Sequence, residues 1–361
     1  MPEQTYRVIQ WMTGRVGKIG IRHFVDNPGF ELVGVLVHDK EKVGKDAGEL
    51  AGVAPTGVIA TDDVEAILAL DADCVFYTPW LFADVDAICR ILRTGKNVVT
   101  TAGYFHPNDD NRADGAKLAA ACRVGGTSFH GGGIHPGFAG DVLPLTLARL
   151  VSRIDTIHVY EIVNVLLDTP IEDHIELFGF GKDKDEFLSN PTMLGMGVPF
   201  FAQAMATIAD GLGRQVDDLT TALTAAVATE DIAYSLGVIP RGTVAAQYHE
   251  WTAWSDGKPL IVFHAMYTTG DATNMEPPWD WGKTRYRIVI DGDPPSELTL
   301  EGVTRPDGSM VHPGYEWTAM GAINAIPHVC DARPGWITQL DIGLVQPRNL
   351  VRARRAQEEP Q

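Results

Sequence analysis

Residues 6–17 read Tyr6-Arg7-Val8-Ile9-Gln10-Trp11-Met12-Thr13-Gly14-Arg15-Val16-Gly17, an apolar run that leads into two glycines. Tyr6–Trp11 has the continuous apolar character of a buried strand, and the residues after Gly17 continue with helical spacing. Glycines at such a strand-to-helix turn let backbone N–H groups approach a pyrophosphate, whose charge the helix N-terminus stabilises. The stretch therefore predicts a dinucleotide-binding Rossmann fold.

Strand and helix patterns alternate through the first 140 residues, as they do in a parallel sheet covered by helices. The further strand patterns are Glu31–Val37, Asp73–Tyr77, Lys96–Thr101 and Thr127–His130. Asp84–Thr94 has the apolar spacing of an amphipathic helix, and Gly131–Phe138 forms a glycine-rich loop after the last strand. This part of the chain is expected to be an α/β Rossmann domain.

Beyond residue 140 the strand patterns follow one another closely, which predicts an α+β domain with a mixed or antiparallel sheet. These strands are expected at Thr156–Asn164, Val244–Ser255, Leu260–Thr269 and Thr284–Asp291. Helices at Pro199–Leu212 and Asp217–Thr229, or a second subunit, are expected to cover one face. We therefore expect a Rossmann domain at 1–140 and a substrate-binding and dimerisation domain at 141–318. Residues 319–361, with a helix at Trp317–Val329, are expected to return to the first domain.

Composition narrows the class of protein. With 361 residues the chain is long enough for two domains, and its net charge of −18 disfavours nucleic acids and anionic membranes as partners. The four cysteines, Cys74, Cys89, Cys122 and Cys330, form no metal-binding spacing. Without a long apolar run or a leader pattern, the sequence predicts a cytoplasmic protein that binds no metal.

The form of the nicotinamide cofactor stays open between NAD and NADP. Asp39, which follows the second strand, is placed to bind a ribose hydroxyl and would favour NAD. Lys40 and Lys42 can neutralise a 2′-phosphate, which slightly favours NADP. Met12 stands where the first glycine of the GxGxxG pattern belongs, so it must tolerate or reshape a tight turn. The predicted cofactor contacts are Thr13, Gly14, Arg15, Val16, Gly17, His38, Asp39, Lys40, Tyr77, Thr78, Pro79, Thr101, Ala102, Gly103, His135 and Asn324.

Three stretches resemble the N-terminal domain of the dihydrodipicolinate reductases: Gly14–Gly17, Gly44–Gly52 and Asn97–Tyr104. The resemblance covers about the first 140 residues. The histidine- and lysine-bearing signature of those enzymes is expected near Glu161, where this chain reads Glu161–Asp168 without it. Reduction of dihydrodipicolinate is therefore not expected.

Over its whole length the chain is similar to the group that contains 2,4-diaminopentanoate dehydrogenase and the native amine dehydrogenases. The similarity is carried by Gly133–Phe138, Phe178–Gly181 and Asn324–Pro327. It implies a homodimer built through second-domain sheets, and hydride transfer from NAD(P)H to an imine made from a ketone and ammonia. Amine-forming members carry a catalytic glutamate just after the threonine pair, whereas this chain has Ala102–Phe105 there. Ammonia-dependent amination is thus in doubt, but the dehydrogenase assignment is not.

Hydride transfer to C=O or C=N needs a proton donor within hydrogen-bond reach. Tyr104, beside the position of the missing glutamate, and His135 are the predicted catalytic residues, with His106 as a third candidate. Phe138, Asn164, His174 and Phe178 are the predicted substrate contacts, and aromatic residues around them favour a small hydrophobic substrate. The alternative function is that of a non-catalytic NAD(P)-binding sensor on the same fold.

Overall fold

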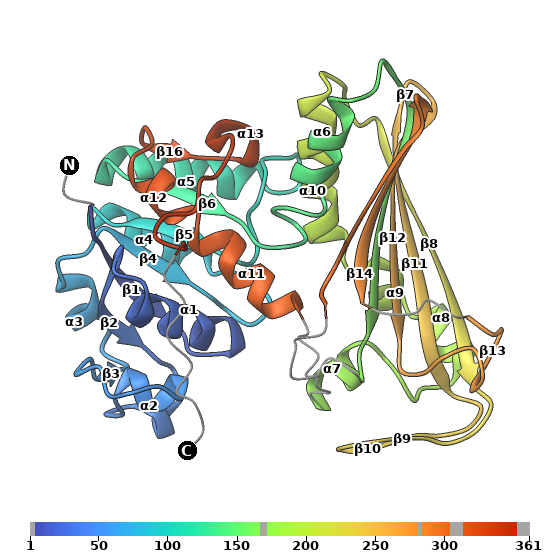
Figure 1. The fold of residues 1–361 in the computed structure, drawn as a ribbon, viewed down its shortest axis with the longest axis horizontal. Coiled ribbons are helices and arrows are strands. Elements are labelled where there is room, and N and C mark those ends of the chain that lie inside the picture. The colour runs from blue at the N-terminus through green and yellow to red at the C-terminus, as the bar shows by residue number, and fades with distance from the viewer. Residues whose placement is uncertain (1–3, 167–171, 280–283, 304–312, 352–361) are drawn as a thin grey trace. The chain divides into compact units, whose positions relative to one another are not determined.

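The computed structural model of the chain describes residues 4–166, 172–279, 284–303 and 313–351 (Figure 1). The chain divides into two compact units. Unit 1 combines Met1–Gly133 with Tyr315–Gln361, and unit 2 is Ile134–Gly314.

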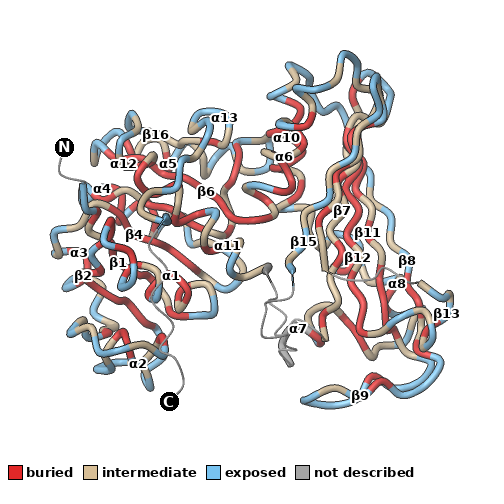
Figure 2. The backbone as a smooth tube through the Cα atoms, viewed as in Figure 1, coloured by how far each residue is buried: buried red, intermediate tan, exposed pale blue. Residues whose placement is uncertain are grey.

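Unit 1 is built on a parallel sheet of seven strands in the order β16-β6-β5-β4-β1-β2-β3. The strands are β1 (Tyr6–Trp11), β2 (Phe30–Leu36), β3 (Ala60–Thr61), β4 (Cys74–Tyr77), β5 (Asn97–Thr100), β6 (Ser128–Gly131) and β16 (Gly335–Trp336). The central strands are buried on both faces (Figure 2), which explains why the sequences of β1 and β4 are mainly apolar. The predicted Rossmann domain is confirmed.

Helices cover both faces of this sheet. They are α1 (Arg15–Asp26), η1 (Lys40–Lys42), α2 (Ala47–Ala51), α3 (Val64–Ala69), α4 (Val85–Arg93), α5 (Arg112–Gly125), α11 (Pro313–Ile323), α12 (Ile326–Cys330) and α13 (Gln339–Ile342). One core lies between the sheet and α1, α11 and α12; the other lies between the sheet and α3, α4 and α5. The C-terminal helices therefore complete the core of unit 1, although nearly two hundred residues separate them from β6.

Unit 2 is built on a mixed sheet in the order β13-β8-β11-β12-β7-β14-β15. Its strands are β7 (Arg153–Asn164), β8 (Asp218–Ala228), β11 (Val244–Ser255), β12 (Lys258–Thr268), β13 (Met275–Glu276), β14 (Arg285–Asp293) and β15 (Ser296–Glu301). β7 and β12 are parallel and the other pairs are antiparallel, so the predicted mixed sheet is confirmed.

The core of unit 2 lies between one face of this sheet and a layer of helices. These are α6 (Val142–Ala148), α7 (Glu172–Leu177), α8 (Lys184–Ser189), α9 (Pro191–Gly195) and α10 (Val198–Gly211). The stretch Pro191–Gly211 is long and apolar enough to cross a membrane by length and composition alone. Residues of both helices in this stretch, such as Met193 and Met205, belong to the core of unit 2, so the stretch is explained as a core element.

One predicted helix is wrong: Asp217–Thr229 is not helical but forms strand β8, hydrogen-bonded to β11 over ten residue pairs. Its alanines and leucines favour a helix locally, but exposure alternates along Asp218–Leu223, as in a strand with one face covered. Pairing with β11 outweighs the weak local propensity. The strand β15 and the hairpin β9 (Ile232–Tyr234) and β10 (Gly237–Ile239) were not predicted.

Candidate active site

The turn after β1 contains a residue in the left-handed backbone region, Met12, whose φ is +72°. A side chain in this left-handed region costs about 1–3 kcal/mol unless its surroundings hold it there. The backbone N–H of Met12 donates to the carbonyl of Leu36 at 2.8 Å, which ties the turn to β2. Met12 therefore adopts the conformation that a glycine would otherwise provide.

Gln10, a fully buried polar residue in β1, stabilises the same turn through side-chain hydrogen bonds. Its Nε2 donates to the carbonyl of Met12 at 2.8 Å and to Oγ1 of Thr78 at 2.9 Å. The Thr78 hydroxyl lies 3.1 Å from the Trp11 carbonyl and 3.2 Å from that of Met12. Gln10 and Thr78 thus join the turn after β1 to the loop after β4.

The two glycines of this turn have different surroundings. A Cβ on Gly17 would lie 2.3 Å from the Met12 carbonyl oxygen, so no side chain fits there. A Cβ on Gly14 would meet nothing within 4 Å. Gly14 is also the N-cap of α1 and makes no side-chain cap hydrogen bond, so the first N–H groups of α1 have no capping side chain. Backbone N–H groups at an uncapped, open helix N-terminus fit a pyrophosphate.

The segment after β2 carries charges of both signs. Asp39 caps η1 by accepting a hydrogen bond from the N–H of Glu41 at 3.0 Å, and its carboxylate lies 3.6 Å from Nζ of Lys42. Lys40 pairs with Asp62. His38 is exposed. Each lysine already has a carboxylate partner. Asp39 can accept a hydrogen bond from a ribose hydroxyl, and Lys40 and Lys42 are cations that a 2′-phosphate would attract, so the geometry is compatible with either group.

The remaining predicted cofactor residues of unit 1 follow neighbouring strands. Tyr77 ends β4, the neighbour of β1, and Thr78 and Pro79 follow it. Thr101–Gly103 follows β5, the next strand in the sheet, so both loops lie with the β1 turn at the carboxyl edge. Gly103 has a φ of +90° and packs closely against Ala83. Asn324 lies in the break between α11 and α12. The structure therefore brings most of the predicted cofactor loops to one edge of one sheet, where ligands of open α/β sheets bind.

Tyr104 turns its hydroxyl toward α5. The hydroxyl donates to Oδ2 of Asp114 at 2.7 Å, and the ring packs edge-on against Phe129 and Trp336. Burial, together with the charge of Asp114, raises the pKa of Tyr104 well above its usual range. Its proton is thus engaged within unit 1. His106 is buried nearby in the sequence, with its carbonyl accepting from Asn111.

His135 belongs to unit 2, where it lies over the carboxylate of Glu161. The His135 Nδ1 is 3.3 Å from Oε2 of Glu161, although not in line for a hydrogen bond. The ring is enclosed by Phe201, Phe263 and Tyr286, at centroid separations of 4.6, 5.2 and 5.8 Å. The result is a buried imidazole–carboxylate pair with apolar walls.

Two tyrosines complete this cluster. The Tyr267 hydroxyl donates to Oε2 of Glu161 at 3.0 Å, and the Tyr286 hydroxyl donates to Oε1 at 3.2 Å. Burial, and then the charge of Glu161, raises the pKa of Tyr267 well above its ordinary value. The Tyr267 phenol therefore remains a protonated donor that stabilises the carboxylate. We call His135, Glu161, Tyr267 and Tyr286 the His135 cluster.

Of the predicted substrate contacts, Phe178 packs against the His135 cluster, with its ring centroid 4.9 Å from that of Tyr267. Asn164 ends β7, where its Oδ1 accepts from the N–H of Leu166 at 3.2 Å. Phe138 is 39% exposed in the loop that carries His135. His174 lies in α7, outside the residues whose side chains the structure describes.

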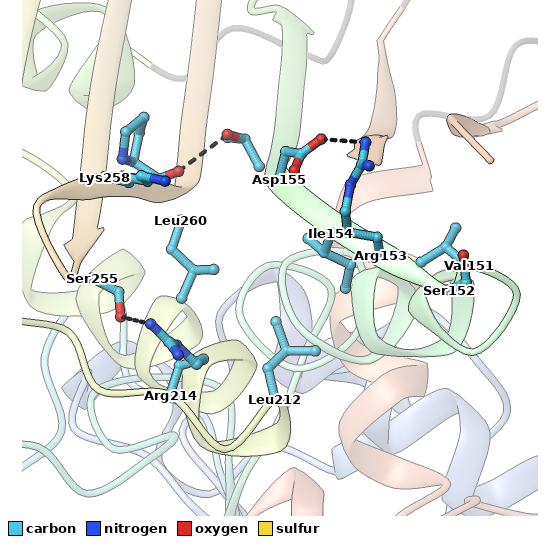
Figure 3. Close-up of a pocket in the computed structure, with 12 residues that line it drawn as sticks. Val151, Ser152, Arg153, Ile154, Asp155, Leu212, Arg214, Ser255, Lys258 and Leu260 are labelled. Atoms are coloured by element: carbon cyan, nitrogen blue, oxygen red, sulfur yellow. Dashed lines mark hydrogen bonds and ion pairs between the residues drawn. The ribbon is translucent and has the colours of Figure 1, made fainter. Parts of the chain in front are cut away.

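A cavity of about 650 Å³ lies elsewhere in unit 2, between the starts of β7 and β12 and the end of α10 (Figure 3). Arg153 and Arg214 line it, but each pairs with an acid, Asp155 and Asp256 respectively. None of the residues predicted for the site lines this cavity. In the described part of the chain, no group of three or more histidines, cysteines and acids is arranged to hold a metal ion.

Four residues that shape these two regions were not predicted: Gln10, Glu161, Tyr267 and Tyr286. Gln10 could have been found as a polar residue between the apolar Ile9 and Trp11 of β1. Glu161 interrupts the apolar positions of β7, where Ile157 and Val159 are fully buried. The tyrosines gave no signal of their own, because only strand register brings them to Glu161.

Comparisons with known proteins cover both units. Residues 8–121 match the family model of the dihydrodipicolinate reductase N-terminus, and residues 138–358 match that of the 2,4-diaminopentanoate dehydrogenase C-terminal domain. An amine dehydrogenase from Streptomyces virginiae is 33% identical over 352 residues, which are 93% of this chain and 96% of that protein. A 4-hydroxy-tetrahydrodipicolinate reductase from Hahella chejuensis is 33% identical over 116 residues, which are 31% of this chain and 41% of that protein.

Solved structures share the fold. The amine dehydrogenase from Mycobacterium smegmatis has a TM-score of 0.77 at 21% identity, covering 95% of this chain and 98% of that one. Scyllo-inositol dehydrogenase from Lactobacillus casei, solved with NAD(H) and scyllo-inositol, has a TM-score of 0.57 at 14% identity, covering 94% and 93%.

Proposed function

Since the chain belongs to the oxidoreductase family of the amine dehydrogenases and 2,4-diaminopentanoate dehydrogenase, we propose that it transfers hydride from NAD(P)H to a C=O or C=N carbon. The substrate is a small, mainly apolar carbonyl or imine compound. The observation that carries this proposal is the turn at Met12–Gly17, where a closely packed Gly17 and an open Gly14 precede an uncapped helix N-terminus.

The residues of this turn fit a dinucleotide. Gly14 and the N–H groups at the start of α1 would hold the pyrophosphate, and Asp39 and Lys40 would meet the adenine ribose or its 2′-phosphate. When bound, the cofactor supplies the hydride. The chain's own residues then have to orient the substrate and deliver a proton to the oxygen or nitrogen that gains negative charge.

Two proton donors remain candidates, and the geometry favours His135 over Tyr104. The Tyr104 hydroxyl donates to Asp114, whereas Nε2 of His135 has no hydrogen-bond partner among the described residues. Asp109 is the first acid after Thr101 in the chain. Carbonyl and preformed-imine reduction are therefore expected to exceed ammonia-dependent amination, which needs a base to deprotonate ammonium.

We also propose a cytoplasmic homodimer, with the second copy on the sheet face of unit 2 that the helices leave open. That face carries partly exposed aromatic and apolar side chains such as Tyr160, Tyr248 and Met266. Exposed apolar groups on one sheet face are typical of association surfaces. NADPH is slightly preferred over NADH in this proposal, on the strength of Lys40 and Lys42.

The first test is a titration of the protein with NAD, NADH, NADP and NADPH, followed by melting temperature and nicotinamide fluorescence. Binding in the micromolar range should raise the midpoint by mass action. The complex is then assayed with a panel of hydrophobic ketones, aldehydes and imines, with and without ammonia. NAD(P)H oxidation with at least one compound is expected.

The alternative outcomes separate the two functions. Binding without turnover across the panel would support a non-catalytic nucleotide sensor. No midpoint shift with any of the four nucleotides would contradict both the enzyme and the sensor.

A further inference from the structure

Glu161 is a carboxylate that the sheet of unit 2 places among hydroxyl donors. Tyr286 of β14 lies directly opposite Glu161 of β7 in the antiparallel register. On the other side of β7, Ala265 of β12 is the parallel partner of Glu161, and Tyr267 lies two residues beyond Ala265. Both hydroxyls donate to the carboxylate, one to each oxygen. The Glu161 side chain is 14% exposed. A buried carboxylate is stable when several donors and a cation compensate its lost hydration.

His135 is the cation-forming side chain next to this carboxylate, and in the described part of the chain Glu161 has no other ion-pair partner. The His135 side chain is 2% exposed. Its position is fixed by close packing, because a Cβ on Gly140 would lie 2.1 Å from its Cδ2. Among the residues that the structure describes, its ring nitrogens have no hydrogen-bond partner, which is rare for buried polar atoms and points to a group that acquires its partners when a ligand binds.

We propose that Glu161 is a positioning residue that holds His135 as an imidazolium, with Nδ1 toward the carboxylate and Nε2 as the proton donor. This inference rests on the proposed function and assigns its acid. Tyr267 and Tyr286 keep Glu161 in place by occupying both of its oxygens.

The proton-transfer step balances with these groups. As hydride adds to the substrate carbon, the C=O or C=N π electrons move to the oxygen or nitrogen. That atom takes the proton from Nε2, and the N–H electron pair stays on the ring, which becomes neutral. The products are an alcohol or amine, NAD(P)+ and neutral His135, and Glu161 remains charged throughout. A neighbouring carboxylate stabilises the imidazolium and so extends the pH range in which the donor is loaded.

The aromatic side chains that pack against His135 in the described part of the chain are uncharged. Phe201 of α10 and Phe263 of β12 present only apolar rings to it, and Tyr286 presents a phenol. Asp141, in the same loop, is fully buried and accepts hydrogen bonds from the backbone N–H groups of Gly137 and Val142 at 2.9 and 2.7 Å. Glu161 is therefore the group expected to control the protonation of His135.

The decisive measurement is an NMR titration of the histidine ring signals in the full chain without substrate or cofactor, with His135→Asn used to assign the His135 signal. In Glu161→Gln the His135 ring should lose its proton at a lower pH than in the unmodified protein, because the negative charge 3.3 Å from Nδ1 is gone. Glu161→Asp should restore most of this shift. In Tyr286→Phe the charge remains, so the midpoint should move little or rise.

Glu297→Gln is the matched control, since Glu297 pairs with Arg287 on the other face of the same sheet. It should leave the His135 titration unchanged. Where a substrate is known, the alkaline limb of the kcat/KM profile should move with the ring titration in Glu161→Gln and stay in place in Glu297→Gln.

A second measurement keeps the proposal testable if Glu161→Gln does not fold. In the unmodified protein at high pH, the nitrogen shifts of neutral His135 should report the tautomer with its proton on Nδ1, toward Glu161. A proton on Nε2, or an unchanged titration in a folded Glu161→Gln, would overturn the proposal. Neither result depends on turnover, whereas the proposed function fails through absent nucleotide binding.

Discussion

The turn after β1 depends on Met12 and Gly17 in different ways: Met12 stands where a glycine is usual, whereas Gly17 cannot carry a side chain. Met12 adopts a φ of +72°, and its carbonyl then occupies the space that a side chain at position 17 would need. Gln10 and Thr78 hold that carbonyl with a hydrogen bond each, at 2.8 and 3.2 Å. A glycine at the first position of the GxGxxG pattern is thus dispensable here, while the last glycine is not.

Gly17→Ala is therefore expected to disrupt the turn and abolish nicotinamide nucleotide binding, with a lower melting temperature. Gly14→Ala is the matched control for folding, because its Cβ meets nothing within 4 Å. It should melt like the unmodified chain but bind nucleotide about tenfold or more weakly if the pyrophosphate passes over Gly14. Equal nucleotide affinity in Gly14→Ala and the unmodified protein would place the pyrophosphate elsewhere.

Single substitutions distinguish the two candidate proton donors, Tyr104 and His135. Tyr104→Phe removes a hydroxyl that donates to Asp114 at 2.7 Å, so it should destabilise unit 1 by about 1–3 kcal/mol and change the chemical step little. His135→Asn should lower that step by about 10²- to 10⁴-fold with nucleotide affinity retained. Single-turnover rates and urea unfolding of both variants measure this. A large rate loss in Tyr104→Phe with normal stability would return the donor role to Tyr104.

At the level of elements, sequence patterns predicted most strands but failed where pairing decides. The central Rossmann strands β1 and β4 are mainly apolar on both faces, so their pattern can be recognised without knowing their partners. β8 is different: its alanine-rich sequence becomes a strand only because β11 lies beside it. The same dependence hid the His135 cluster, since Glu161, Tyr267 and Tyr286 come from three strands and meet through register. Loop residues after β1, β4 and β5 were easier to predict, because every parallel strand delivers its loop to the same edge.

The C-terminal helices are a second case in which packing decides a detail that the sequence pattern does not predict. Their apolar character predicted a helix at Trp317–Val329, and the structure divides it into α11 and α12 with Asn324 and Ala325 between them. Ile323 and Ile326, on either side of this break, are fully buried in the core of unit 1. A single helical pattern does not specify such a break, because it depends on which surface the segment packs against.

For the whole molecule, the buried histidines predict how stability depends on pH. Burial lowers the pKa of His130 in unit 1, and of His249 and His264 in unit 2, from 6.5 to about 4. Between these values the unfolded chain binds protons that the folded chain does not bind. The contribution of these histidines to the free energy of unfolding should therefore have its full value above pH 6.5. It should fall as the pH drops toward 4, by about 1.4 kcal/mol per pH unit for each such histidine.

The two units should differ in this response, since unit 2 contains two of these histidines and unit 1 contains one. If the units unfold in separate transitions, the transition of unit 2 should be about twice as steep in pH. Carboxylates such as Asp46 and Asp62, whose pKa values lie below 3.8, act only at more acidic pH and leave this window to the histidines. Urea unfolding at several values between pH 7.5 and 4.5 measures the slope. His249→Gln should reduce it for unit 2, and His38→Gln, at an exposed site, should not; equal slopes for all three proteins would show that buried histidines do not govern acid stability.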